Sequence, residues 1–165
     1  MLLSYLGACG FQPALAPGAP ATTLQSRILI EEPDDRATFL IAQRLEERLG
    51  QPTAPDLSLD VSLAIEERPA AFTSDREITR YTLEGDLTYS VTDTTGRTVA
   101  NGTVRSFTAY SATGTTVATL AAEEDAEDRL AIALADLLVA RLIAEIPPEP
   151  TIAVSGSASA GLTRR

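Results

Sequence analysis

Hydrophobic and polar residues alternate in two stretches of the chain, a pattern typical of β-strands with one buried face. In residues 57–66, leucine, valine and isoleucine occupy the odd positions. In residues 82–92 the larger apolar side chains again occupy odd positions, with Gly85 the exception. A turn at residues 93–96 then predicts a returning strand over residues 98–110. The alternation changes phase near Asn101 and Gly102, which predicts a bulge or bend there.

Two other stretches repeat apolar residues at helical spacing. Asp34 and Asp35 can cap a first helix that runs to Leu49, and Gly50 ends it. A longer helix is predicted over about residues 118–146, with acids in its first turns and Arg141 near its end, as the helix dipole favours. The β-branched run of residues 27–31 predicts one more strand, at the start of the domain.

The predicted order of elements is therefore βαβββα. Three consecutive strands with polar outer faces favour an antiparallel meander, and the two helices must cover its apolar face. The expected fold class is α+β, a two-layer sandwich of a four-stranded sheet with two helices on one face.

The last helix carries two apolar stripes on nearly opposite sides. One stripe consists of Leu130, Leu134, Leu137 and Leu138, and the other of Ile132, Val139, Ile143 and Ile146. A helix that lies on a sheet needs only one such stripe. The second must contact the first helix, a folded-back tail (Ile152 and Val154), or another protein, for which it would be a partner surface.

The amino end contains a leucine, two small residues and then Cys9, which resembles the lipobox of bacterial lipoproteins. In that motif the cysteine thiol accepts a diacylglycerol, which anchors the protein to a membrane. We therefore expect residues 1–8 to be a truncated lipoprotein signal peptide and residues 9–23 a lipidated tether. Residues 24–146 would form the folded domain and residues 147–165 a disordered tail. The alternative is an ordinary cysteine near the chain terminus.

Composition narrows the possible functions. The net charge is −10, which argues against nucleic-acid binding. There is no histidine and Cys9 is the one cysteine, which excludes imidazole chemistry, zinc–thiolate sites and internal disulfides. No phosphate-binding loop or nucleophile motif occurs in the sequence. We therefore predict that the protein is not an enzyme and binds neither a cofactor nor a metal. A hydrolase that uses carboxylates alone is the least favoured alternative. The five acids of residues 123–128 are interpreted as a solvated helix start rather than a cation site.

Arginines introduce a local positive charge. Residues 94–122 contain no acid but include Arg97 and Arg105. Arg76 and Arg80 lie just before the third predicted strand, near Asp75 and Glu77. Arginines at a sheet end can bind phosphate or carboxylate groups through paired hydrogen bonds. The alternative is a scatter of surface arginines that keeps the strands soluble.

Several segments together resemble the lipopolysaccharide-assembly lipoprotein family LptE, in its alphaproteobacterial form. The resemblance begins at Cys9-Gly10-Phe11-Gln12-Pro13 and continues with residues 79–83, Leu87-x-Tyr89 and Gly96. It extends through the fourth strand and the start of the long helix, at Gly102, Arg105, Ser106, Tyr110 and residues 122–126. In all it spans residues 6–143, in the family's order and spacing.

The resemblance implies a lipoprotein at the periplasmic face of the outer membrane that plugs and helps assemble the β-barrel LptD. It would assist lipopolysaccharide transport to the cell surface, without catalysis. Cys9 would carry the lipid, and Gly10, not being aspartate, would permit sorting to the outer membrane. The polar strand faces and the second stripe of the last helix would contact the barrel. Arg80 and Arg105, and more loosely Arg97, would contact the glycolipid. The alternative is a periplasmic auxiliary lipoprotein or lipid-binding carrier of a transport system.

Overall fold

A computed structural model describes residues 24–146, which form four strands and two helices. In chain order the elements are β1 (Ile28–Ile30), α1 (Arg36–Leu49), β2 (Leu57–Phe72), β3 (Ile78–Asp93), β4 (Thr98–Ser111) and α2 (Thr116–Glu145). The predicted order βαβββα and the α+β class are confirmed. β2 and β3 are each longer than their apolar alternation predicts.

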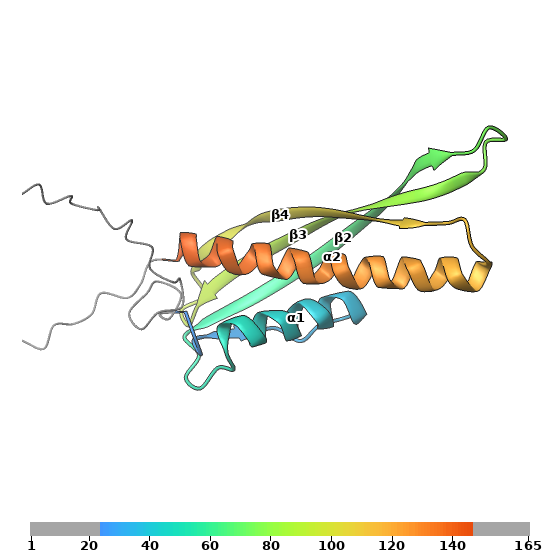
Figure 1. Ribbon diagram of the computed structural model, residues 1–165. Coiled ribbons are helices and arrows are strands. Elements are labelled where there is room, and N and C mark those ends of the chain that lie inside the picture. Colours follow the sequence, from blue (N-terminus) through green and yellow to red (C-terminus); the bar gives the residue numbers. More distant parts are fainter. Residues whose placement is uncertain (1–23, 147–165) are drawn as a thin grey trace, which may run out of the picture.

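The strands form one sheet in the order β1-β2-β3-β4. β1 pairs with β2 in parallel, and the β2–β3 and β3–β4 pairs are antiparallel. β4 therefore runs in the same direction as β1 and β2. Both helices lie on the same face of this sheet, as predicted, and the other face has no covering element among residues 24–146 (Figure 1).

The core lies between the sheet and the helices, where the odd-numbered residues of β3 meet α2. Leu83, Leu87 and Val91 are all buried there. Gly85 interrupts this row, and a Cβ atom at this position would lie 2.9 Å from Cδ1 of Leu134 and 3.1 Å from Cδ2 of Leu130. The missing side chain thus forms a notch in β3 that accommodates two leucines of α2.

Both ends of α1 are capped by the residues that the sequence indicates. Asp35 Oδ1 accepts from the Thr38 backbone N–H at 2.8 Å, and the Asp35 N–H donates to Thr38 Oγ1 at 3.1 Å. The first of these bonds is the main reason why the pKa of Asp35 is lowered. Gly50 ends the helix with a φ of 77°, a conformation that favours glycine.

Two local predictions were wrong. The register irregularity of β4 lies at Val99, because Thr98 pairs with Thr92 whereas Ala100 pairs with Val91. Asn101 and Gly102 stay in register, and the apolar pattern breaks there for another reason. A Cβ atom at Gly102 would lie 3.0 Å from Tyr89 Oη, so the tyrosine ring occupies the space of a side chain at this position.

The acids of the long helix also lie elsewhere than predicted. Thr115 caps α2 by accepting from the Ala118 N–H, so the helix begins at Thr116. No acid lies in its first turn, and Glu123 follows about two turns later. The expected match between these acids and the helix dipole is therefore absent at the start of α2.

The two ends of the sheet differ in how the helices cover them. At the near end, which we define by β1 and residues 57–63 of β2, α1 and α2 both cover the sheet. At the far end, which we define by residues 64–82, the β2–β3 hairpin extends past α1 (Figure 1). Most of β2 from Ile65 onward is exposed.

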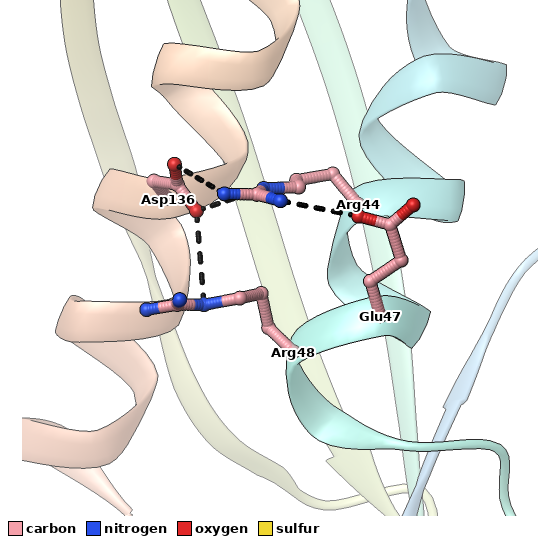
Figure 2. A network of polar contacts seen from close by, with 4 residues as sticks. All are labelled: Arg44, Glu47, Arg48 and Asp136. Atoms are coloured by element: carbon pink, nitrogen blue, oxygen red, sulfur yellow. Dashed lines mark hydrogen bonds and ion pairs between the residues drawn. The ribbon is translucent and has the colours of Figure 1, made fainter.

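A polar network joins the two helices on the outside of the core. Arg44 of α1 donates from Nε and Nη2 to the two carboxylate oxygens of Asp136 on α2, at 3.0 and 3.1 Å. Arg48 Nε lies 3.8 Å from the same carboxylate, and Glu47 binds Arg44 at 3.1 Å (Figure 2). The paired bonds fix the position of α1 along α2.

Candidate functional site

The face of the sheet that no helix among residues 24–146 covers is called the open face here. The even-numbered residues of β2 and β3 and the odd-numbered residues of β4 point to it, because their neighbours along each strand point to the helices. Its central side chains are Ser62, Glu66, Arg68, Thr82, Glu84, Asp86, Thr88, Thr103, Arg105 and Phe107. The open face is therefore polar along most of its length.

Charges on the open face are paired across the strands. Arg105 Nε donates to Asp86 Oδ1 at 2.9 Å, between β4 and β3. Arg68 Nη2 lies 2.8 Å from Glu66 Oε2 and 3.7 Å from Glu84 Oε2. The hydrogen bond from Arg68 lowers the pKa of Glu66. The two arginines thus offset most of the charge of the three carboxylates, and these exposed pairs contribute little to stability.

One aromatic side chain projects from this polar surface. Phe107 is 76% exposed and pairs across the strands with Glu84. Beside it lies a shallow hollow of about 420 Å³, whose lining includes Thr82, Asp86 and Arg105. An exposed aromatic ring surrounded by hydrogen-bonding groups is typical of a protein contact surface. The sequence analysis missed Phe107, although an aromatic residue at a polar position of the alternation could have identified it.

The three arginines to which the resemblance gives a role in glycolipid contact do not come together. Arg97 lies in the β3–β4 turn at the near end, where its Nε donates to Asp93 Oδ2 at 3.1 Å. Asp93 also accepts from Thr95, and this hydrogen bond is the main reason why its pKa falls to about 2. Arg80 lies at the far end, opposite Ser111. The predicted positive region of the fourth strand is thus neutralised, since Arg97 and Arg105 each bind an aspartate.

Arg80 and Arg76 differ from the other arginines of the described domain. Neither has a carboxylate within 4 Å among residues 24–146, and both side chains are exposed. Arg76 lies in the β2–β3 turn with a φ of 66°. The far end therefore presents two cations that are free to bind an anion. Arg76 had no role in the resemblance, but the sequence analysis places it beside Arg80 just before the third predicted strand.

The second apolar stripe of the long helix is largely used inside the domain. Val139 and Ile146 are each 4% exposed and Ile143 is partly buried. Two of these three positions are therefore in the core and not on a partner surface, because α1 packs on this side of α2 through the Arg36–Asp128 and Arg44–Asp136 pairs. Only Ile132, 40% exposed, keeps an accessible apolar side chain. In the first stripe, Leu137 is 45% exposed against expectation.

The helix-facing side of the far end is acidic. Tyr110 Oη donates to Glu67 Oε2 at 2.7 Å, and its ring stacks on Tyr81 with centroids 5.3 Å apart. Burial raises the pKa of Tyr110, and the bond to Glu67 adds to this. Burial is also the main cause that raises the pKa of Glu127, followed by repulsion from Glu123 and its neighbours. Even so, residues 24–146 contain no group of three side chains placed to hold a metal ion.

The remaining sequence predictions concern residues outside the described range. Cys9, the predicted signal peptide of residues 1–8, the tether of residues 9–23 and the tail of residues 147–165 all lie there. Within the described domain, neither helix has both the length and the apolar composition needed to cross a bilayer.

Comparison with known proteins identifies relatives of this domain. The model of the family LptE, described as Lipopolysaccharide-assembly, matches residues 23–142. Among solved structures, a Caulobacter crescentus protein has a TM-score of 0.60 at 22% identity, covering 75% of this chain and 93% of that one. Rare lipoprotein B from Shewanella oneidensis has a TM-score of 0.58 at 14% identity, covering 73% and 94%. No curated protein matches. The two solved structures share the fold.

Proposed function

The chain belongs to the LptE family of lipopolysaccharide-assembly proteins, and from this we propose that it is an outer-membrane lipoprotein that plugs and helps assemble an LptD-type β-barrel. In this role it assists the transport of lipopolysaccharide to the cell surface and catalyses no reaction. The observation that carries the proposal is the open face, a polar sheet surface that no element of residues 24–146 covers, in a domain of this family.

The membrane anchor in this proposal is Cys9. Acylation of its thiol would hold the chain at the periplasmic face of the outer membrane, and residues 10–23 would connect the lipid to the domain. Growth with radioactive palmitate tests this step. We expect the wild-type protein to be labelled and membrane-bound, and Cys9→Ser to lose both properties. A labelled Cys9→Ser protein would contradict the assignment.

The open face is the surface that we assign to the barrel. The interior of a large outer-membrane barrel is mostly polar, so a plug needs polar side chains with a few apolar anchors. The open face offers hydroxyl groups, paired charges and the exposed ring of Phe107. Its polar character and its length suit contact with such a wall.

Site-specific photo-crosslinking from single positions tests this orientation. The probe replaces Thr88 or Phe107 on the open face, and the matched control replaces Gln43, which is exposed on α1. Each variant is co-expressed with the barrel of its own organism. We expect an adduct of the barrel's mass from both open-face positions and none from Gln43. Absence of an adduct from both open-face positions would overturn the proposal.

Direct contact with the glycolipid is a second step of the same proposal, and Arg80 is the position that the structure favours. Its guanidinium has no internal carboxylate partner within residues 24–146, whereas Arg97 and Arg105 each bind an aspartate. A free guanidinium can form paired hydrogen bonds with a phosphate group. We expect Arg80→Gln to weaken binding of purified lipopolysaccharide several-fold, and Arg105→Gln to change it less. Equal effects would contradict this choice.

A carrier that holds an acyl chain between the sheet and the helices would need an internal cavity of several hundred cubic ångströms. Leu59, Leu87 and Leu134 fill that space, and each is 0% exposed. The hollows of about 420 and 350 Å³ lie on the open face instead. The packed core therefore counts against the carrier alternative.

A further inference from the structure

The outer edge of β4 has no neighbouring strand among residues 24–146, because β4 is the last strand of the sheet. The strand is 14 residues long, contains no proline, and has Arg105 as its one charged residue. Such an edge presents unpaired N–H and C=O groups and accepts another strand unless charges, prolines or a covering element prevent it. Little in the sequence of β4 prevents pairing.

A flank of α2 that is apolar as far as Leu137 lies above the same edge. Arg129 Nη1 donates to Thr108 Oγ1 at 2.9 Å, which shows the side of α2 that faces β4. Ala133 and Leu137 follow at intervals of four residues and continue that side, and the next residue in the series is Arg141, which pairs with Glu145. α1 packs on the other flank. Leu137 is 45% exposed although it is in phase with the buried Leu130 and Leu134, so no residue of the described range 24–146 covers it fully.

The chain leaves α2 at the near end of the sheet, where β4 begins. Ile146 lines a hollow of about 290 Å³ there, together with Val99 of β4 and also Leu57 at the start of β2. Residues 147–150 contain three prolines. In the extended conformation that proline favours, four residues span about 12 Å, enough to cross the roughly 10 Å between two packed layers.

The residues that follow have the pattern of a strand. In residues 151–155, Ile152 and Val154 alternate with threonine, alanine and serine. This is the alternation of β2 and β3, whose apolar residues face the helices and whose polar residues form the open face. Five extended residues span about 17 Å. The last turns of α2 from Leu137 to Glu145 rise about 12 Å, so the segment is long enough to reach Leu137.

The topology of the sheet also favours a strand at this place. β4 runs in the same direction as β1 and β2, and both helices cross over the same face. A strand that follows α2 and pairs in parallel with the outer edge of β4 would be the fifth in the order β1-β2-β3-β4. The connection from β4 through α2 to this strand would then run in the same direction across the sheet as the connection from β1 through α1 to β2. It would therefore repeat the β1–α1–β2 crossover with the same hand, and about 98% of such crossovers are right-handed.

We propose that residues 151–155 pair in parallel with the outer edge of β4 as a fifth strand of the sheet. Ile152 and Val154 pack against the flank of α2 that contains Leu137, and Thr151, Ala153 and Ser155 extend the open face. The tail thereby covers an edge and an apolar flank that residues 24–146 leave uncovered. This inference concerns the chain's own tail and does not depend on the proposed function.

Amide hydrogen exchange measured by NMR tests the pairing. Three chains are compared: the full chain, a chain that ends at Glu149, and a control that ends at Ser155 and so keeps the segment. We expect the outward amides between Ala100 and Arg105 to exchange about tenfold faster or more in the chain ending at Glu149. The control should exchange like the full chain. Equal rates in all three chains would overturn the proposal.

A pair of double variants separates the segment from the rest of the tail. Ile152→Asp with Val154→Asp should abolish the protection of β4, whereas Ser157→Asp with Ser159→Asp adds the same charge at the same spacing and should leave it intact. None of these positions belongs to the core of residues 24–146, so the domain still folds. Protection that depends on protein concentration would assign the edge to a second copy. Protection that requires the barrel would assign it to a partner strand. Either result would overturn the proposal.

Discussion

The near and far ends of the sheet are made from the same strands, yet they have different surroundings. At the near end both helices cover β2 and β3, and Leu59, Leu87 and Val91 are 0% exposed. At the far end β2 is mostly exposed from Ile65 onward, and Phe72 is 60% exposed. There the Tyr81–Tyr110 stack and the bond from Tyr110 to Glu67 lie where the near end has packed leucines. The two ends therefore differ in packing: β2 is covered at the near end and exposed on both faces over much of the far end.

The largest expected effect is a loss of stability at the near end. Leu87→Ala leaves a cavity among fully buried side chains and should lower the free energy of unfolding by about 3 kcal/mol. The matched far-end variant Ile65→Ala removes a side chain that is 36% exposed and should cost less than about 1 kcal/mol. Urea denaturation measures both values. Similar losses at the two ends would mean that the far end is packed as tightly as the near end.

A smaller effect is expected from the polar network between α2 and the C-terminal half of α1. Asp136→Asn removes the charge that binds Arg44 and Arg48, and should lower the free energy of unfolding by about 1 kcal/mol. High salt should reduce the difference, because these side chains are 32–45% exposed. The control Asp125→Asn breaks a pair within α2 and should cost no more than about 0.5 kcal/mol. A loss that persists unchanged at high salt would contradict a mainly electrostatic role.

The smallest effect concerns pH at the far end. The pKa of Glu127 is raised above its ordinary value of 4.5, chiefly by burial, so its ionised form lowers stability at neutral pH. Protonation removes this penalty, which is therefore present at pH 7 and lost as the pH falls below 4.5. Glu127→Gln should raise the free energy of unfolding at pH 7 by less than about 1 kcal/mol and have no effect near pH 4. Glu46→Gln removes the same charge from an exposed position of α1 that does not affect the pKa of Glu127, and serves as the control.

The fold could be predicted because its signals are local. The alternation in residues 57–66 and the Asp35 cap depend on neighbours in sequence, and both led to the correct elements. The β4 bulge could not be placed, because the space at Gly102 is filled by Tyr89 from another strand. The far half of β2 was missed for a related reason. Both of its faces are exposed, so burial imposes no alternation there.

The candidate site was harder to predict because it depends on pairing between strands. The positive region around Arg97 and Arg105 exists in the sequence, but the register places Asp86 opposite Arg105 and removes it. The packing of α1 likewise decided that Val139 is buried and Ile132 is accessible. A single sequence contains neither the register nor the helix contacts, so the residues left for a partner could be identified only after folding.

The notch at Gly85 has a mechanical consequence for the whole domain. Leu130 and Leu134 fit where β3 lacks a side chain, and the next positions along that face are Leu83 and Leu87. If α2 moved along the sheet by one turn, about 5.4 Å, a leucine of α2 would clash with a leucine of β3. The contacts at Gly85 therefore set the position of α2 along the sheet, and one missing side chain fixes the register between the two layers.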